Sequence, residues 1–196
     1  NGGYAYIHPM HDLKTEKLRW NWQTPILLSM HNQDILYMAS NKLHRSRNKG
    51  KTFEEISPDL SNGRKDGDVS YGTISCISES KFEFGLIYAG TDDGNIQLTK
   101  NEGKTWSNIS QKLPQHLWVR KIVASEHKKE RVYALLNGHT WDHFNSYIYI
   151  SEDYGTTWTQ VGNNLPAECL NALKEDAITE DILYVGSDAG LYISTD

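Results

Sequence analysis

The segment "SEDYGTTW", Ser151–Trp158, lies between an apolar run and a return to alternating polar and apolar residues. It combines a glycine with an acid, two threonines and a tryptophan, which is more chemistry than a tight turn needs. Asp153 can therefore be interpreted as a catalytic acid beside an aromatic ring, or as part of an architectural turn. A segment that recurs along the chain favours the second interpretation.

The segment does recur. "SRNKGKTF" at Ser46–Phe53 and "TKNEGKTW" at Thr99–Trp106 share its pattern, and "STD" at Ser194–Asp196 begins a fourth copy. A second marker, a tyrosine within a β-type run, recurs in phase with this eight-residue box. The tyrosines lie 51, 45 and 51 residues apart and the box glycines 53 and 52 residues apart: Tyr37, Tyr88, Tyr133 and Tyr184; Gly50, Gly103 and Gly155.

Each copy is predicted to contain four short strands. A β-type run is followed by the tyrosine strand, a short turn, a third strand, the box and a fourth strand, without sustained 3.6-residue periodicity. This is the signature of a β-propeller blade. We therefore expect an all-β β-propeller of four-stranded antiparallel blades, with about three and a half blades present. The expected boundaries are a leading segment 1–19, blade one 20–60, blade two 61–112, blade three 113–164 with an insertion 137–146, and incomplete blade four 165–196.

The box itself is interpreted as a turn that fastens itself. Its third residue can accept hydrogen bonds from downstream N–H groups, its glycine can adopt φ > 0, and its last aromatic ring can be buried between sheets. The residues to which we assign this structural role are Ser46, Asn48, Gly50, Phe53, Thr99, Asn101, Gly103, Trp106, Ser151, Asp153, Gly155 and Trp158.

The pattern Ser/Thr-x-Asp/Asn-x-Gly-x-Thr-Trp/Phe resembles the Asp box, or BNR repeat, of sialidases, sortilin-type receptors and xyloglucan-cleaving glycosidases. Together with spacers such as "RWNWQTPILLS" and "YGTISCISES", it resembles the exported bacterial proteins with sortilin-like BNR repeats, often labelled glycosyl-hydrolase-like. The resemblance implies a box distant from the active site, an extracellular, periplasmic or cell-surface location, and further blades in a longer parent chain.

Closure of the propeller can be imagined in two ways. "GYAYIHP", within the leading segment, alternates well enough to supply the missing outer strand of a four-bladed ring. We favour a larger propeller, because the chain ends inside a box.

Composition excludes several classes of function. The chain has 196 residues, a formal net charge of −5 and a pI of about 5.9, so it lacks the basic field that nucleic-acid binding requires. No stretch approaches the roughly 20 apolar residues of a membrane-spanning helix. Cys76 and Cys169 are the only cysteines and do not indicate a disulfide framework. No nucleic acid, membrane insertion or cofactor is expected.

Blade three differs from the others in one loop. The spacing from the tyrosine to the box is 9, 11 and 10 residues in the other blades but 18 in blade three, and the extra piece is "NGHTWDHFNS". Its aromatic and polar residues could stack on a sugar ring or bind a polar ligand, or could pin the loop to the next blade. The candidate ligand-binding residues in it are His139, Trp141, Asp142, His143 and Phe144.

Three further features have their own interpretations. The two histidines of the insertion resemble a zinc motif, but Gly138 indicates a loop and not a helix, so no metal site is predicted. Trp118 and Arg120, at the start of blade three, are added to the candidate ligand-binding residues, whereas Trp22, at the same place in blade one, is expected to pack. "DDG" at Asp92–Gly94 is predicted to be a hairpin turn.

The sequence therefore favours an exported binding scaffold whose loops present a surface to a protein, peptide or glycan. The alternative is a glycoside hydrolase of the Asp-box type, with part of its active site outside this chain and Asp142 as its acid. Sialidase activity is not supported, because only six arginines are present. A third class is an assembly factor that docks on a protein complex.

Overall fold

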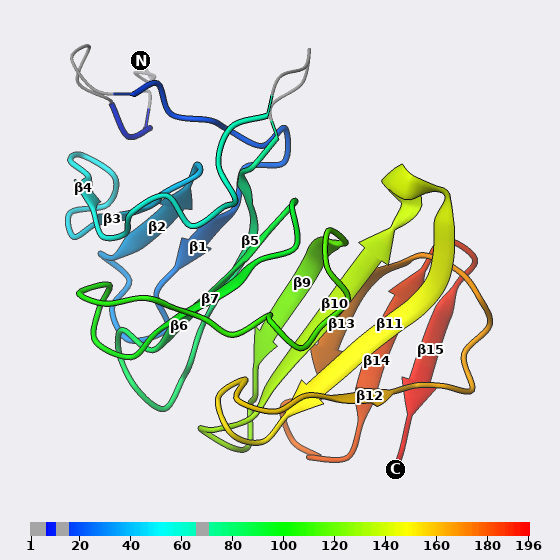
Figure 1. Cartoon of the computed structure of the whole chain (residues 1–196). Coiled ribbons are helices and arrows are strands. Elements are labelled where there is room, and N and C mark those ends of the chain that lie inside the picture. Colours follow the sequence, from blue (N-terminus) through cyan, green and yellow to red (C-terminus); the bar gives the residue numbers. More distant parts are fainter. Residues whose placement is uncertain (1–6, 11–15, 66–70) are drawn as a thin grey trace, which may run out of the picture.

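The protein folds into four antiparallel sheets that follow one another along the chain (Figure 1). The computed structural model describes residues 7–10, 16–65 and 71–196. Strands pair in sequence order within every sheet, so each sheet is a meander with short turns. These sheets are blades of a β-propeller, as predicted from the repeats, and the fourth blade has three strands.

The bounds of the strands are as follows. Blade 1 contains β1 (Ile26–Leu28), β2 (Leu36–Ala39), β3 (Leu43–Ser46) and β4 (Glu54–Glu55). Blade 2 contains β5 (Ile74–Glu79), β6 (Ile87–Thr91), β7 (Ile96–Thr99) and β8 (Ser107–Asn108). Blade 3 contains β9 (Trp118–Ala124), β10 (Val132–Gly138), the 3₁₀ turn η1 (His139–Trp141), β11 (His143–Ser151) and β12 (Thr159–Val161). Blade 4 contains β13 (Leu170–Glu175), β14 (Leu183–Ser187) and β15 (Leu191–Ser194).

Apolar side chains are buried at each of the three joints between neighbouring blades. The repeat tyrosines Tyr37, Tyr88 and Tyr133 lie in these joints with exposures of 0%, 0% and 2%. Burial of a large apolar side chain stabilises a fold by roughly 1.5–3 kcal/mol. A blade has no core of its own, so its stability depends on the blades beside it.

A buried polar clamp accompanies the apolar packing at the joint between blades 1 and 2. The Tyr37 hydroxyl donates a hydrogen bond of 2.8 Å to the Glu79 carboxylate, and the Ser29 hydroxyl donates one of 2.6 Å. The imidazole Nε2 of His31 lies 2.8 Å from the carbonyl oxygen of Ser80. The carboxylate is therefore held by groups from the preceding blade.

The same clamp recurs 96 residues later, at the joint between blades 3 and 4. Tyr133 and Ser125 donate hydrogen bonds of 2.9 and 3.0 Å to Glu175, and the His127 ring lies 2.7 Å from the carbonyl oxygen of Asp176. The strands and boxes therefore repeat from blade to blade, whereas the clamp repeats once in every two blades.

The joint between blades 2 and 3 lacks the carboxylate. In blades 2 and 4, Glu79 and Glu175 pair with Ile87 and Leu183 of the neighbouring strand. In blade 3, the residue at the same position is Ala124, which pairs with Val132. Within the described part of the chain, the buried hydroxyl of Tyr88 has no hydrogen-bond partner.

The boxes form turns closed by their own side chains. In the third box, the Gly155 amide donates to the Ser151 hydroxyl at 2.7 Å, and the Thr157 amide donates to the Asp153 carboxylate at 2.8 Å. Tyr154 and Gly155 both adopt left-handed backbone angles, with φ of 60° and 85°. The first two boxes repeat these contacts with asparagine at the third position.

The box tryptophans join neighbouring blades. The indole of Trp106 donates to the carbonyl oxygen of Ile56 at 2.9 Å, and that of Trp158 donates to Ile109 at 2.8 Å, each time in the preceding blade. A cavity of about 580 Å³ lies between blades 3 and 4. It is lined by Val161, which has the same place in blade 3 that Ile56 and Ile109 have in blades 1 and 2. Because this space holds a tryptophan at the two earlier joints, we assign the cavity to interblade packing and not to a ligand.

The leading segment packs on blade 1. A Cβ atom on Gly50 would lie 2.3 Å from Cγ2 of Ile7. At the equivalent glycines of the next two boxes, a Cβ atom on Gly103 would meet Ile56, and one on Gly155 would meet Ile109. Ile7 therefore takes the position of an outer-strand residue from a preceding blade. The proposed closing strand "GYAYIHP" covers residues 3–9, and residues 3–6 of it lie outside the described residues.

Candidate ligand-binding site

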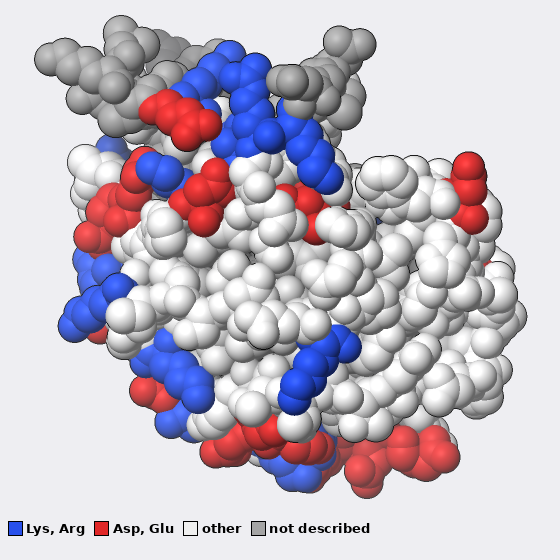
Figure 2. All heavy atoms as spheres, viewed as in Figure 1, with Lys and Arg blue, Asp and Glu red and all other residues white. Residues whose placement is uncertain are grey.

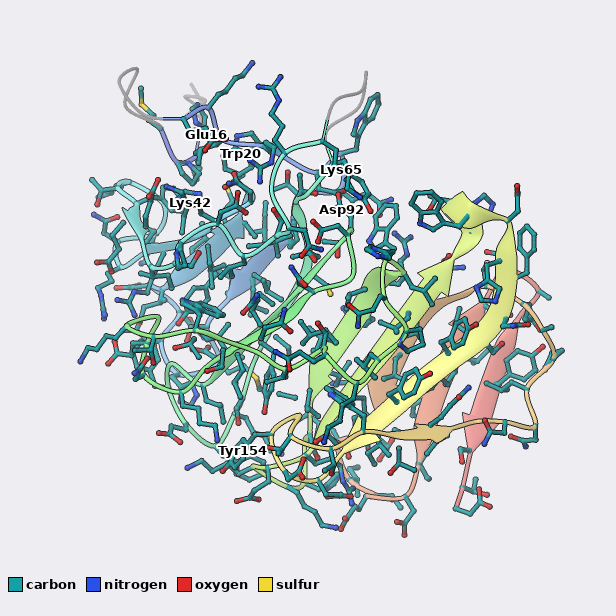
Figure 3. The ribbon with its side chains drawn as sticks, viewed as in Figure 1. Glu16, Trp20, Lys42, Lys65, Asp92 and Tyr154 are labelled. Carbon is teal, nitrogen blue, oxygen red and sulfur yellow. The ribbon has the colours of Figure 1, made fainter. Side chains whose placement is uncertain are left out.

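The insertion of blade 3 extends a hairpin and does not form an irregular loop. Strand β10 continues to Gly138 and strand β11 begins at His143. The single turn η1 joins them at one end of the blade (Figure 1). Asp142 ends this turn with a left-handed φ of 54°. Figure 3 places Asp92, in the corresponding β6–β7 turn, at the opposite end of the blades from Tyr154 of the third box.

A cavity of about 190 Å³ lies beside η1, between blades 3 and 4. It brings together Trp118 and Arg120 from β9 with His139 from the insertion. Three of the seven candidate ligand-binding residues thus share one cavity. The full lining is Trp118, Arg120, Asn137, His139, Thr140, Cys169, Asn171 and Asp188.

The cavity contains one cation and one carboxylate. The Arg120 guanidinium lies 5.5 Å from the centre of the Trp118 ring, and its Nη1 donates a hydrogen bond of 2.9 Å to Gln23 of blade 1. No carboxylate of the described residues forms an ion pair with this guanidinium. The Asp188 carboxylate accepts a hydrogen bond of 2.7 Å from Asn171. The site therefore offers separate donors and acceptors to a ligand.

The floor of the cavity is buried. Burial, together with the nearby Asp188 carboxylate, raises the pKa of the Cys169 thiol, so this thiol is neutral near pH 7. The indole nitrogen of Trp118 is buried without a hydrogen-bond partner among the described residues.

The other four candidates of the insertion lie outside the cavity lining. The indole of Trp141 is 57% exposed and donates a hydrogen bond of 3.2 Å to the carbonyl oxygen of His116. Phe144 is 47% exposed and contacts His139 edge to face at 5.8 Å. The His143 ring lies 2.9 Å from the Tyr147 hydroxyl along the hairpin, and Asp142 is exposed. Trp141 and Phe144 are thus exposed aromatic rings, and Phe144 contacts the cavity residue His139.

The expectation that Trp22 packs is wrong. Its side chain is 88% exposed, although Trp118, its equivalent in blade 3, is largely covered. Gln23, the next residue, reaches Arg120 across the propeller, so blade 1 also contributes to the surroundings of the site.

Sequence reasoning missed Asp188, Asn171 and Cys169. Asp188 occupies the turn position that Asn41, Asp92 and Asn137 occupy in the other blades, and this alignment was the available signal. Asp188 and Arg120 line the same cavity only because blade 4 packs against blade 3, and no local sequence pattern shows that packing.

The turn at Asp92 has a structural role. Its carboxylate accepts hydrogen bonds of 2.9 Å from the Gly72 and Thr73 amides and one of 2.6 Å from the Thr73 hydroxyl. Burial raises the pKa of this carboxyl. The predicted hairpin turn is confirmed, since β6 and β7 pair on either side of it.

On the face drawn in Figure 2, charged side chains of both signs gather along the upper, left and lower margins, and a broad uncharged area extends from the middle to the right-hand edge. In the described ranges, no group of three His, Cys, Asp or Glu residues is placed to hold a metal ion. No helix in the described part of the chain is long and apolar enough to cross a membrane.

A family model and solved structures resemble this chain. The Sortilin-Vps10 family, described as "Sortilin, neurotensin receptor 3", matches residues 41–196. No curated protein matches the chain. Because the identities to the solved structures below are all under 25%, these similarities show the fold alone.

Two GH74 enzymes share the fold. An ancestral GH74 enzyme has a TM-score of 0.70 at 16% identity, over 88% of this chain and 23% of that one. A GH74 xyloglucanase from Xanthomonas campestris has a TM-score of 0.66 at 15% identity, over 87% and 28%. YCF48 bound to D1 peptide has a TM-score of 0.51 at 14% identity, over 90% and 60%. The chain spans about a quarter of the length of the two GH74 structures.

Proposed function

The chain belongs to the Sortilin-Vps10 family, and from this premise we propose that it is part of an exported β-propeller that binds a ligand in the cavity between blades 3 and 4. The observation that carries the proposal is the meeting of Trp118, Arg120 and His139 with Asp188 in one cavity. The exposed ring of Phe144 contacts the cavity residue His139, and exposed aromatic surface is typical of recognition sites. In this cavity, His139 and Thr140 of the insertion share a lining with Asn171 and Asp188, polar residues of the next repeat.

The chemistry of the lining suits a ligand with both donors and acceptors. Arg120 can bind an acceptor such as a carbonyl, hydroxyl or carboxylate, and Asp188 can accept from a hydroxyl or an amide. Both a peptide and a glycan carry such groups. The GH74 and YCF48 structures, whose titles name an enzyme class and a peptide complex, make both ligand classes reasonable to test.

Binding is favoured over hydrolysis by the count of carboxylates. A glycosidase of the common type needs two carboxyl groups about 5–10 Å apart, and Asp188 is the single carboxylate in the described lining. Asp142, the acid suggested by the sequence, lies outside the cavity. A glycoside hydrolase would need its second acid from residues beyond this lining.

Paired arrays of oligosaccharides and peptides would test the proposal. We expect one class to bind the wild type, Arg120→Gln to weaken that binding at least tenfold, and Lys104→Gln, an exposed lysine of the second box, to leave it unchanged. Equal binding by the wild type and Arg120→Gln would refute the site. Turnover of a bound glycan that Asp188→Asn abolishes would support the hydrolase. Export is tested by the location of the full protein in fractionated cells.

A further inference from the structure

A second cavity, of about 200 Å³, lies along the first strands of the blades. It is lined by the ends of β5 and β9 and by β13, whereas the candidate ligand-binding site lies at the start of β9. Arg120 of the candidate site and Lys121 of the second cavity are consecutive residues of β9, which spans Trp118–Ala124. The two linings have no residue in common, so the cavities are separate sites that meet near the middle of this strand.

Three lysines from three different blades line this second cavity: Lys81, Lys121 and Lys174. Lys174 and Lys81 share the carboxylate of Glu126, with Nζ to oxygen distances of 2.8 and 3.4 Å. The hydrogen bond from Lys174, with a smaller effect from Lys81, lowers the pKa of Glu126, so this carboxylate is ionised near pH 7.

Positive charge is in excess in this cavity. Lys121 is exposed and forms no ion pair with the described residues. The other carboxylate in the lining, Glu79, is buried at 5% exposure and already accepts hydrogen bonds from Tyr37 and Ser29. Three lysines thus line the cavity and, besides the buried Glu79, one carboxylate, Glu126, which pairs with two of them, in a chain whose net charge is −5.

The fold does not require lysine at these positions. Lys174 pairs across the sheet with the repeat tyrosine of blade 4, and the residues that pair with the other repeat tyrosines are Leu27, Ser78 and Val123. These cross-strand partners of the repeat tyrosines align the four blades. In this alignment, the residues equivalent to Lys81 are Met30, Glu126 and Ala177. The residues equivalent to Lys121 are Pro25, Cys76 and Ala172. Each lysine therefore occurs in one blade only.

We propose that this lysine cavity binds an anionic group, a carboxylate or a phosphate. A water molecule occupies about 30 Å³ in the liquid, so the cavity admits a group of several heavy atoms but not a folded segment. Three ammonium groups in a partly enclosed space attract such a group more strongly than exposed lysines do. The group can belong to a small molecule or to an acidic segment of a protein.

Nuclear magnetic resonance titration of the ¹⁵N-labelled protein tests this proposal. Sodium phosphate and sodium citrate are added at constant ionic strength, with sodium chloride as the reference. We expect saturable shifts of the Lys121, Val123 and Lys174 amides, and a dissociation constant raised about tenfold in Lys121→Gln. Lys104→Gln is the matched control and should bind as the wild type does.

A hexaglutamate peptide distinguishes the two sources of the anionic group. Displacement of phosphate by the peptide would assign the site to acidic protein segments, and binding of phosphate or citrate alone would assign it to small molecules. Absent or linear shifts with all three probes, or equal affinity in Lys121→Gln, would overturn the proposal. The spectrum of each variant also shows whether it is folded, and neither result depends on the ligand of the other cavity.

Discussion

The hydroxyl of Tyr133 donates a hydrogen bond of 2.9 Å to the carboxylate of Glu175, which belongs to the next blade. The Ser125 hydroxyl and the Glu126 amide donate to the same carboxylate, which is fully buried. A buried carboxylate is tolerated only when its oxygens are satisfied. The clamp therefore links the stability of blade 4 to three donors from blade 3.

Removal of the clamp hydroxyl should destabilise the protein. Tyr133→Phe leaves the buried carboxylate of Glu175 with one donor fewer, and we expect the free energy of unfolding to fall by about 1–3 kcal/mol. Tyr88→Phe is the matched control, because the Tyr88 hydroxyl has no partner in the described structure; it should be neutral or stabilising. Urea denaturation of both variants measures this difference, and equal losses would contradict the assignment.

A clamp should be transferable to the joint that lacks one. Ala124→Glu places a carboxylate where Glu79 and Glu175 stand in the other joints, facing the Tyr88 hydroxyl. We expect a coupling of about 1 kcal/mol between Ala124→Glu and Tyr88→Phe in a double-mutant cycle. A coupling near zero would show that the blade 2–3 joint differs in more than this residue.

The propeller could be predicted from the sequence because its markers are local. The box needs a hydroxyl, an Asn or Asp and a glycine within five residues, and the repeat tyrosine lies within one strand. Such signals survive in a single sequence at fixed intervals. The prediction of antiparallel blades followed from them and is confirmed.

The candidate site was only partly predictable because three of its eight lining residues come from another repeat. The insertion pointed to His139, but Asn171 and Asp188 approach only when blade 4 packs on blade 3. The clamp has the same character, since Tyr133 and Glu175 lie 42 residues apart in the sequence. Contacts across a joint leave no local pattern, although the 96-residue recurrence of their residue types can be found once the blades are aligned.

The third box should tolerate asparagine. Asn48 and Asn101 accept the same amide hydrogen bond, at 2.9 Å, that Asp153 accepts at 2.8 Å, and their Nδ2 groups donate to the box threonine. The Thr157 hydroxyl would therefore change from donor to acceptor in Asp153→Asn. Thermal unfolding should show a small change for Asp153→Asn and a larger loss for Asp153→Ala; equal losses would contradict this explanation.

The same variant predicts a dependence on pH. The Thr157 amide hydrogen bond is the main cause of a lowered pKa at Asp153. A lowered folded-state pKa means that the stabilisation is present above the unfolded pKa of about 3.9 and is lost as the pH falls through the folded value. Asp153→Asn should therefore lose less stability than the wild type below pH 4.

A box glycine should not be replaceable. Gly103 has a φ of 88°, and a Cβ atom there would lie 2.2 Å from the carbonyl oxygen of Ile56. Gly103→Ala should cost more than about 1 kcal/mol. Gly190, near which no atom would lie within 4 Å of a Cβ, is the control; Gly190→Ala should stay within about 0.5 kcal/mol of the wild type. Urea denaturation compares them, and a tolerated Gly103→Ala would refute the close packing.

Protonation of His44 should weaken the fold in mild acid. Its side chain is 2% exposed, its Nε2 lies 2.9 Å from the Ser40 hydroxyl, and the Trp20 ring stacks on it at 5.8 Å. Burial lowers the pKa of His44 to about 4. Because the unfolded chain binds the proton with a pKa of about 6.5, the stabilisation is full above that value and is lost progressively as the pH falls toward 4.

Urea denaturation at pH 7 and pH 5 separates this effect from general acid destabilisation. The loss of stability between the two pH values should be smaller in His44→Gln than in the wild type, because glutamine does not titrate. His116→Asn is the control, since His116 is exposed and its left-handed backbone suits asparagine; it should keep the wild-type loss. An unchanged loss in His44→Gln would show that His44 is not the buried group that the acid protonates.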